Sequence, residues 1–237
     1  MRKIYAILIT VSALFIASGL SAQTRFGSKR QMEVSAGYSN IVTSDKSEGV
    51  AFKSDLKGAY VGFSYDFNLL KAQWGLLSLE PGARLSYAIE SNPVAEFELL
   101  EKDALKESYL DIPLNVKYSY KLNYITVSAF VGPAFSLGIT STSLHCYDKY
   151  MYKTWNYKGV QEMKGAESED TEYKGISDYS RYDVKLGLGL GFTFMDRFSF
   201  KAAYNFGLLN RYNGLQVLGS KISRHTNVFN IGLGYRF

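Results

Sequence analysis

The feature that most constrains the fold is an alternation of side-chain types over residues 183–194. Every second residue is large and apolar: Val184, Leu186, Leu188, Leu190, Phe192 and Phe194. Successive side chains of a β-strand point to opposite faces, so this segment has one wholly apolar face. Strands of soluble proteins usually run about five or six residues, whereas a tilted strand that crosses a bilayer needs about 9–11. The alternation therefore predicts a membrane-crossing strand.

The same period of two recurs along the chain. It predicts eight strands, over residues 31–41, 56–67, 75–88, 107–120, 123–139, 180–194, 197–209 and 225–237. Apolar residues of each strand would face lipid, and the residues between them would fill a closed, polar lumen. The predicted fold class is all-β, a transmembrane antiparallel up-and-down β-barrel with both chain ends on the same side.

The connections between these strands alternate in length. Three are short, and four form predicted extracellular loops at residues 42–55, 89–106, 140–179 and 210–224. Short periplasmic turns and long external loops are typical of outer-membrane barrels. The 140–179 segment could hold another hairpin and raise the number to ten strands, but its charged later half favours eight. Pro81, Pro113 and Pro133 fall inside predicted strands, where proline cannot donate a hydrogen bond, so we expect β-bulges there.

The N-terminal segment has the pattern of a secretory signal peptide. Arg2 and Lys3 precede an apolar run over residues 4–17, and small residues follow up to Ala22. Cleavage after Ala22 would leave residues 23–237 as the barrel domain. The apolar run is shorter than the roughly 20 residues of a membrane-spanning helix. A single cysteine, Cys146, excludes an intrachain disulfide.

Charged residues fall on the predicted inward face. They are Glu33, Asp66, Glu80, Arg84, Asp111, Lys117, Asp183, Lys185, Lys201 and Arg236. Because eight strands leave an interior just wide enough for side chains, and buried charges need partners, we expect an ion-pair network that plugs the barrel. Glu80, Arg84, Asp111 and Lys117 lie on neighbouring strands and are its best candidates. The alternative interpretation is an ion pathway.

An aromatic stretch in the longest loop is a possible binding surface. Its candidate residues are Tyr147, Tyr150, Tyr152, Trp155 and Tyr157, because tyrosine and tryptophan are enriched at binding hot spots. The alternative is that they extend a hairpin above the membrane and pack on each other.

The remaining composition argues against other chemistry. Only two histidines occur, His145 and His225, and no phosphate loop, dinucleotide fingerprint or zinc spacing is present. We therefore assign no catalytic, cofactor-binding or metal-binding residue, although a hydrolase or acyltransferase at the external rim is a remote alternative. Loss of Arg2 and Lys3 lowers the formal charge from +5 to +3, which is too mild to predict a nucleic-acid partner.

Three motifs carry a family resemblance. They are YLDIPLNVKY at residues 109–118, VGPAFSLG at 131–138 and the terminal NIGLGYRF at 230–237. They resemble the outer-membrane β-barrel family that includes PorT-like proteins of Gram-negative bacteria. The resemblance implies an integral protein of the bacterial outer membrane and a final Phe237 read by the barrel-assembly machinery. The even number of strands and the short connections predict that both termini are periplasmic.

The same resemblance implies a non-enzymatic role in interaction, secretion assembly or envelope structure. The expected partners are outer-membrane lipid, the barrel-assembly machinery and an envelope or secreted protein. A small porin-like solute or ion channel is the main alternative. No functional residue carries over from the resemblance.

Overall fold

The computed structural model describes residues 31–47, 50–72, 75–93, 102–147, 150–165, 171–174, 179–212 and 223–237. These residues form twelve strands: β1 (Met32–Ser47), β2 (Val50–Tyr65), β3 (Phe67–Ala72), β4 (Gly75–Pro93), β5 (Lys102–Leu122), β6 (Ile125–Tyr147), β7 (Tyr150–Trp155), β8 (Val160–Gly165), β9 (Thr171–Lys174), β10 (Tyr182–Phe194), β11 (Phe198–Gly207) and β12 (Ser223–Arg236). None of the described residues belongs to a helix long and apolar enough to cross a membrane.

Eight of the twelve strands close into an antiparallel barrel. The order around the wall is β1, β2, β4, β5, β6, β10, β11 and β12. Closure comes from the pairing of β1 with β12, which runs from Glu33↔Arg236 to Lys46↔Ser223. The β6–β10 pairing joins the two halves in a single register from Tyr182↔Leu137 to Phe194↔Ile125. The predicted eight-stranded up-and-down barrel is confirmed.

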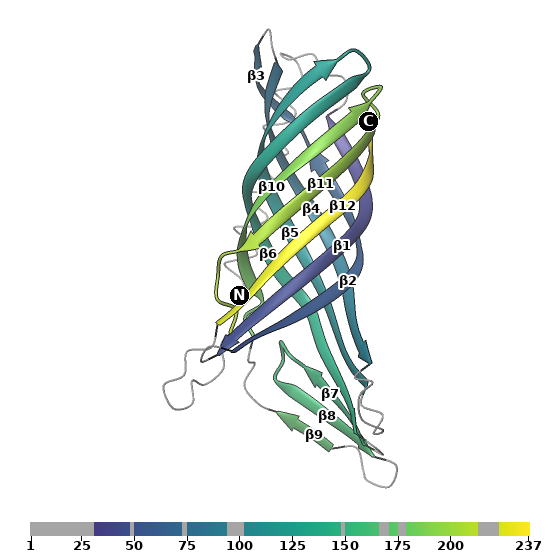
Figure 1. Cartoon of the computed structure of the whole chain (residues 1–237), viewed down its shortest axis with the longest axis vertical. Helices are drawn as coiled ribbons and strands as arrows, with labels where there is room; N and C mark the ends of the chain where they lie inside the picture. Colours follow the sequence, from purple (N-terminus) through teal and green to yellow (C-terminus); the bar gives the residue numbers. More distant parts are fainter. Residues whose placement is uncertain are drawn as a thin grey trace.

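The other four strands extend the wall beyond the barrel. β3 pairs with β4 in continuation of β2, and β7, β8 and β9 add in turn to the far end of β6. Figure 1 shows β3 at the end of the barrel that carries the C-terminus, and the β7–β9 sheet at the opposite end. The described residues of the 140–179 segment thus add a projecting sheet rather than two more wall strands.

The strands run further than the sequence predicted, so the connections are shorter than the predicted loops. β1 and β2 continue to Ser47 and Val50 through most of the 42–55 loop. β4 reaches Pro93 and β5 begins at Lys102, inside the 89–106 loop. The prediction ended each strand where its outward face stopped being apolar. Ladder hydrogen bonds do not require an apolar face, so a hairpin continues past the lipid.

The expected bulges at the prolines are wrong. Pro81 pairs with Leu114, Pro113 with Ala134 and Pro133 with Leu186, each in the register of the flanking pairs. The described register shifts lie elsewhere, at Asn68/Leu70 and Ser108/Tyr109. A missing N–H removes one ladder hydrogen bond without adding a residue, so pairing is skipped locally and resumes in step.

The alternation separates an apolar exterior from a mainly polar interior. On the outside, Val61, Leu190 and Leu233 are 57%, 56% and 69% exposed. On the inside, Ser39 and Thr226 are fully buried. Monomeric soluble proteins rarely expose a continuous apolar surface of this extent, whereas a membrane barrel presents one to lipid.

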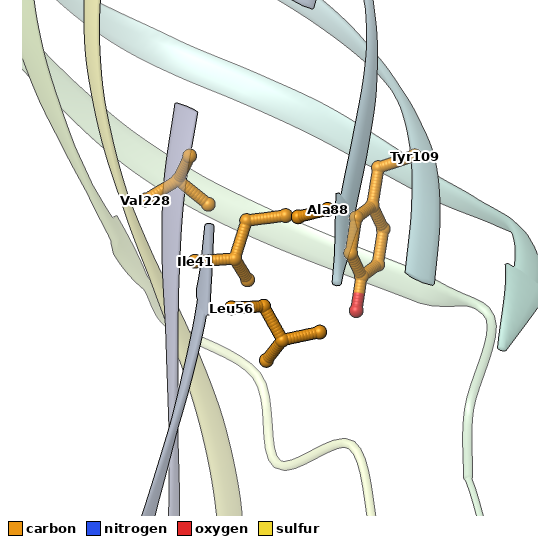
Figure 2. Close-up of a cluster of buried hydrophobic side chains, with 5 residues drawn as sticks. All are labelled: Ile41, Leu56, Ala88, Tyr109 and Val228. Carbon is orange, nitrogen blue, oxygen red and sulfur yellow. The ribbon is translucent and has the colours of Figure 1, made fainter. Parts of the chain in front are cut away.

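The lumen also contains an apolar layer, which the prediction of a polar lumen did not include. Ile41, Leu56, Ala88, Tyr109 and Val228 pack together inside the barrel (Figure 2). All five are at most 1% exposed. They lie toward the β7–β9 end of their strands, where apolar packing fills part of the lumen.

Candidate functional site

Six charged side chains meet in the lumen near the C-terminal end of the barrel. This lumen charge cluster consists of three acids and three bases: Glu33, Asp66, Glu80, Lys117, Lys201 and Arg236. Five come from β1, β4, β5, β11 and β12, and Asp66 lies between β2 and β3. β1 pairs with β12, and β4 with β5, without a register shift, so the inward positions of these strands converge on one section of the barrel.

Each base of the cluster contacts two acids. Lys117 binds both Asp66 and Glu80. Lys201 Nζ lies 2.9 Å from Glu33 Oε1 and 3.0 Å from Glu80 Oε2. Arg236 binds Asp66 through Nη2 and approaches Glu33 at 3.8 Å through Nε.

The cluster carries no net formal charge. Its carboxylates are at most 6% exposed. Isolated buried ions are very costly, and ion pairs reduce the cost only when partners and hydrogen bonds are well placed. The matched charges therefore let the narrow lumen be filled with ionised groups.

A second ion pair lies further along the lumen. Lys185 Nζ lies 3.0 Å from Asp111 Oδ1 and 3.0 Å from Ser136 Oγ. The Lys185 ammonium also lies 5.1 Å from the centre of the Tyr109 ring. This pair separates the lumen charge cluster from the apolar layer.

The predicted grouping of Glu80, Arg84, Asp111 and Lys117 is therefore wrong in part. Glu80 and Lys117 belong to the lumen charge cluster, whereas Asp111 pairs with Lys185. Arg84 is the register partner of Asp111, yet its guanidinium lies over the Tyr60 ring at 5.1 Å. Inward side chains reach across the lumen, so register neighbours need not be ion-pair partners.

Asp183 is the other predicted charge without an ion pair among the described residues. Its carboxylate oxygen Oδ1 accepts a hydrogen bond from the Leu209 backbone N–H at 3.3 Å. Of the ten predicted interior charges, Arg84 and Asp183 thus stand apart, and the other eight form ion pairs.

A hydrogen-bonded cluster at the other end of the lumen was missed by sequence reasoning. Arg211, only 3% exposed, donates to the Tyr109 hydroxyl at 2.9 Å, the Tyr157 hydroxyl at 2.6 Å and Thr226 Oγ1 at 3.0 Å. Tyr109 in turn donates to Glu107. Burial opposes the charged form of Arg211, but Tyr109, Tyr157 and Glu107 raise the pKa of its guanidinium. Arg211 lies in a predicted loop, where the alternation of inward and outward side chains found in strands does not apply.

The aromatic candidates of the long loop differ in their exposure to solvent. Tyr157 is 7% exposed and packs with its hydroxyl against Gly138, so it fastens the β7–β8 turn to the barrel and does not present a surface. Trp155 is partly exposed, with the Lys153 and Lys158 ammonium groups 4.2 and 5.2 Å from its ring. The side chains of Tyr147, Tyr150 and Tyr152 lie outside the described residues.

Two further predictions concern the barrel ends. Phe237 is 58% exposed beside Tyr235, and its backbone N–H donates to Met32 O at 2.9 Å. Its part in barrel assembly stays a prediction, as does the absence of catalytic and cofactor residues. Among the described residues, no group of three or more His, Cys, Asp or Glu could hold a metal ion.

A closed barrel with an apolar outer face and a filled, ion-paired interior defines a transmembrane β-barrel of the small, eight-stranded class. The sequence matches the outer membrane protein beta-barrel domain family over residues 10–237. The chain belongs to this family, which confirms the predicted resemblance to outer-membrane barrels. A search of curated proteins gave no match.

Several solved outer-membrane structures are similar in fold. Ail, the attachment invasion locus protein of Yersinia pestis, is 15% identical with a TM-score of 0.43, over 89% of this chain and 100% of its own. The outer membrane protease OmpT of Escherichia coli is 10% identical with a TM-score of 0.45, over 91% and 100%. OprG of Pseudomonas aeruginosa is 16% identical with a TM-score of 0.39, over 88% and 96%. No activity of this chain follows from these similarities.

Proposed function

We propose that this chain is a non-conducting outer-membrane barrel of PorT-like type, with a role in protein interaction, secretion assembly or envelope structure. The observation that carries the proposal is the lumen charge cluster, whose six side chains cross-link the inner wall. The proposal assigns no enzymatic activity and requires no cofactor.

The filled lumen argues against the porin-like alternative. An ion crossing the barrel would have to separate the Lys117 and Lys201 pairs with Glu80, and then pass the apolar layer around Ile41. Breaking buried ion pairs typically costs about 3–5 kcal/mol each. A pathway with such barriers would not support steady conductance.

The β7–β9 sheet supports the interaction role. It projects from one end of the barrel, and function concentrates on segments held by a rigid scaffold. Arg211 and Tyr157 fasten its base, which gives a partner an ordered surface. With the chain ends in the periplasm, the sheet lies outside the cell, where it would meet an envelope or secreted protein.

Conductance measurements test the plug. Wild-type protein in a planar lipid bilayer should give no steady current. A variant that removes two plugging cations, Lys117→Ala with Lys201→Ala, should conduct if it assembles, and Lys121→Ala should stay silent because Lys121 is exposed near the end of β5. Steady large currents from the wild-type protein would refute the plug.

Affinity capture tests the interaction role. Wild-type protein is compared with a variant in which residues 150–174 are replaced by a short glycine–serine linker. Heat modifiability on gels shows whether each barrel has assembled. The proposal requires a partner that the wild-type protein captures from native outer membranes and the assembled deletion variant does not. Equal capture by both would count against it.

A further inference from the structure

The apolar outer face of the wall ends at a defined level toward the β7–β9 end of the barrel. On β4, the outward residues are apolar or aromatic from Leu77 to Tyr87, which matches the roughly 9–11 residues of a tilted membrane-crossing strand. The register partner of Tyr87 on β5 is Ser108, whose Oγ lies 2.7 Å from Thr140 Oγ1 at exposed positions. Tyrosine is enriched at membrane interfaces, so Tyr87 and these two hydroxyl groups mark the headgroup level.

Two exposed lysines lie directly beyond this level. Lys57 on β2 is the register partner of Ile89 on β4, and Ile89 is the register partner of Lys106 on β5. The Cα atoms of the two lysines are therefore about 10 Å apart, because neighbouring strands are about 4.8 Å apart. Both lysines are exposed, and neither forms an ion pair with another described residue.

The positive charge is confined to one side of the wall. Along the same line of register partners, the next residues are Asn40 on β1 and Thr142 on β6, which are uncharged. The acids Asp55 and Glu90 lie further from the apolar face, and Glu90 Oε1 accepts a hydrogen bond from the Asp55 backbone N–H at 3.0 Å. The two lysines are thus the charged groups next to the lipid-facing surface on β2, β4 and β5.

We propose that Lys57 and Lys106 form a binding site for the phosphate of an anionic lipid headgroup. Each ammonium group offers three hydrogen-bond donors on a flexible four-carbon stem, so both can reach one phosphate that lies over Ile89. Basic residues next to a membrane attract anionic lipids electrostatically. The lysines hold the headgroup at the level that the hydroxyl groups mark.

The apolar surface beside the lysines favours a lipid over a soluble phosphate. Ile89 is 37% exposed and Tyr87 is 48% exposed, and both continue into the apolar outer face of β4. The acyl chains of a lipid whose phosphate lies between the lysines would contact this face. The site goes beyond the proposed function and depends neither on the plugged lumen nor on the projecting sheet.

Lipid titration tests the site. Refolded protein in a neutral detergent is titrated with phosphatidylglycerol or with zwitterionic phosphatidylcholine, and native mass spectrometry measures the fraction of protein that retains lipid. The wild-type protein should bind phosphatidylglycerol about thirtyfold more tightly than phosphatidylcholine, because each interfacial cation contributes about fivefold. Lys57→Gln with Lys106→Gln should lose this preference, and Lys57→Arg with Lys106→Arg should keep it.

A matched variant separates the site from general charge effects. Lys71→Gln with Arg197→Gln removes the same charge from exposed positions at the other end of the barrel and should keep the preference. Heat modifiability shows that each variant has folded. Soluble glycerol phosphate, which lacks acyl chains, should not displace phosphatidylglycerol at an equal concentration.

Four results would overturn the site. They are equal affinity of the wild-type protein for the two lipids, an unchanged preference in Lys57→Gln with Lys106→Gln, an equal loss in the matched variant, and displacement of the lipid by glycerol phosphate. The last result would assign the lysines to a soluble phosphate ester. None of the four bears on conductance or on partner capture.

Discussion

Replacing Lys117 with methionine should destabilise the barrel strongly. The substitution keeps most of the side-chain volume and removes the charge shared by Asp66 and Glu80. Removing one partner of a buried ion pair typically costs about 3–5 kcal/mol. Because Asp66 keeps Arg236 and Glu80 keeps Lys201, we expect the lower end, about 3 kcal/mol, or roughly a hundredfold in the unfolding constant.

The assay is urea unfolding in phosphatidylcholine vesicles, followed by circular dichroism and heat modifiability. Lys121→Met is the matched control, because Lys121 and its partner Asp196 are 59% and 52% exposed and such surface pairs contribute about 0–1 kcal/mol. Adding Glu80→Gln to Lys117→Met restores neutrality and should recover part of the loss, with a coupling of about 1–3 kcal/mol. Equal midpoints for Lys117→Met and Lys121→Met would refute the reasoning.

Three further predictions concern the barrel wall and the β7–β8 turn. Leu188→Arg, on the lipid-facing side, should destabilise the barrel by about 2–4 kcal/mol, whereas Lys158→Arg, at an exposed turn, should be nearly neutral; equal effects of the two substitutions in urea unfolding would argue against lipid at Leu188. Gly132→Ala would place a Cβ 2.1 Å from the Leu114 carbonyl oxygen, so we expect a loss of folded protein on heat-modifiability gels, while Gly62→Ala, which meets Ser35 Oγ at 3.1 Å, should assemble; normal assembly of Gly132→Ala would contradict the close strand approach. Tyr157→Phe removes the 2.6 Å hydrogen bond from Arg211, which should cost about 1.5–3 kcal/mol and expose residues 150–165 to protease before the barrel is cut; unchanged cleavage rates would show that Tyr157 does not fasten the turn.

The side on which each barrel residue lies is readable from sequence. Leu188 and Leu190 face outward and Lys185 faces inward because the side-chain period of a strand is two. Each predicted barrel strand corresponds to a wall strand for the same reason. The apolar signal ended too early for β1 and β2, since the backbone pairing of their outer ends does not require an apolar face.

The partners inside the lumen are not readable in this way. Lys201 and Glu80 are 121 positions apart, and nothing local in either segment indicates the contact. Arg84 and Asp111 are paired in the β-ladder but form no ion pair, and Lys185 from another strand is the ion-pair partner of Asp111. Arg211 and Tyr157 come from connecting segments, for which no periodicity predicts a direction.

The sequence by itself determined a membrane barrel, because alternation over ten or so residues assigns each side chain to lipid or lumen without reference to any other strand. Only the tertiary structure decided which charges meet and that an apolar layer interrupts the polar lumen. These depend on the closure of β1 on β12 and on the stagger of the strands. Both set the heights at which inward side chains from distant segments face each other.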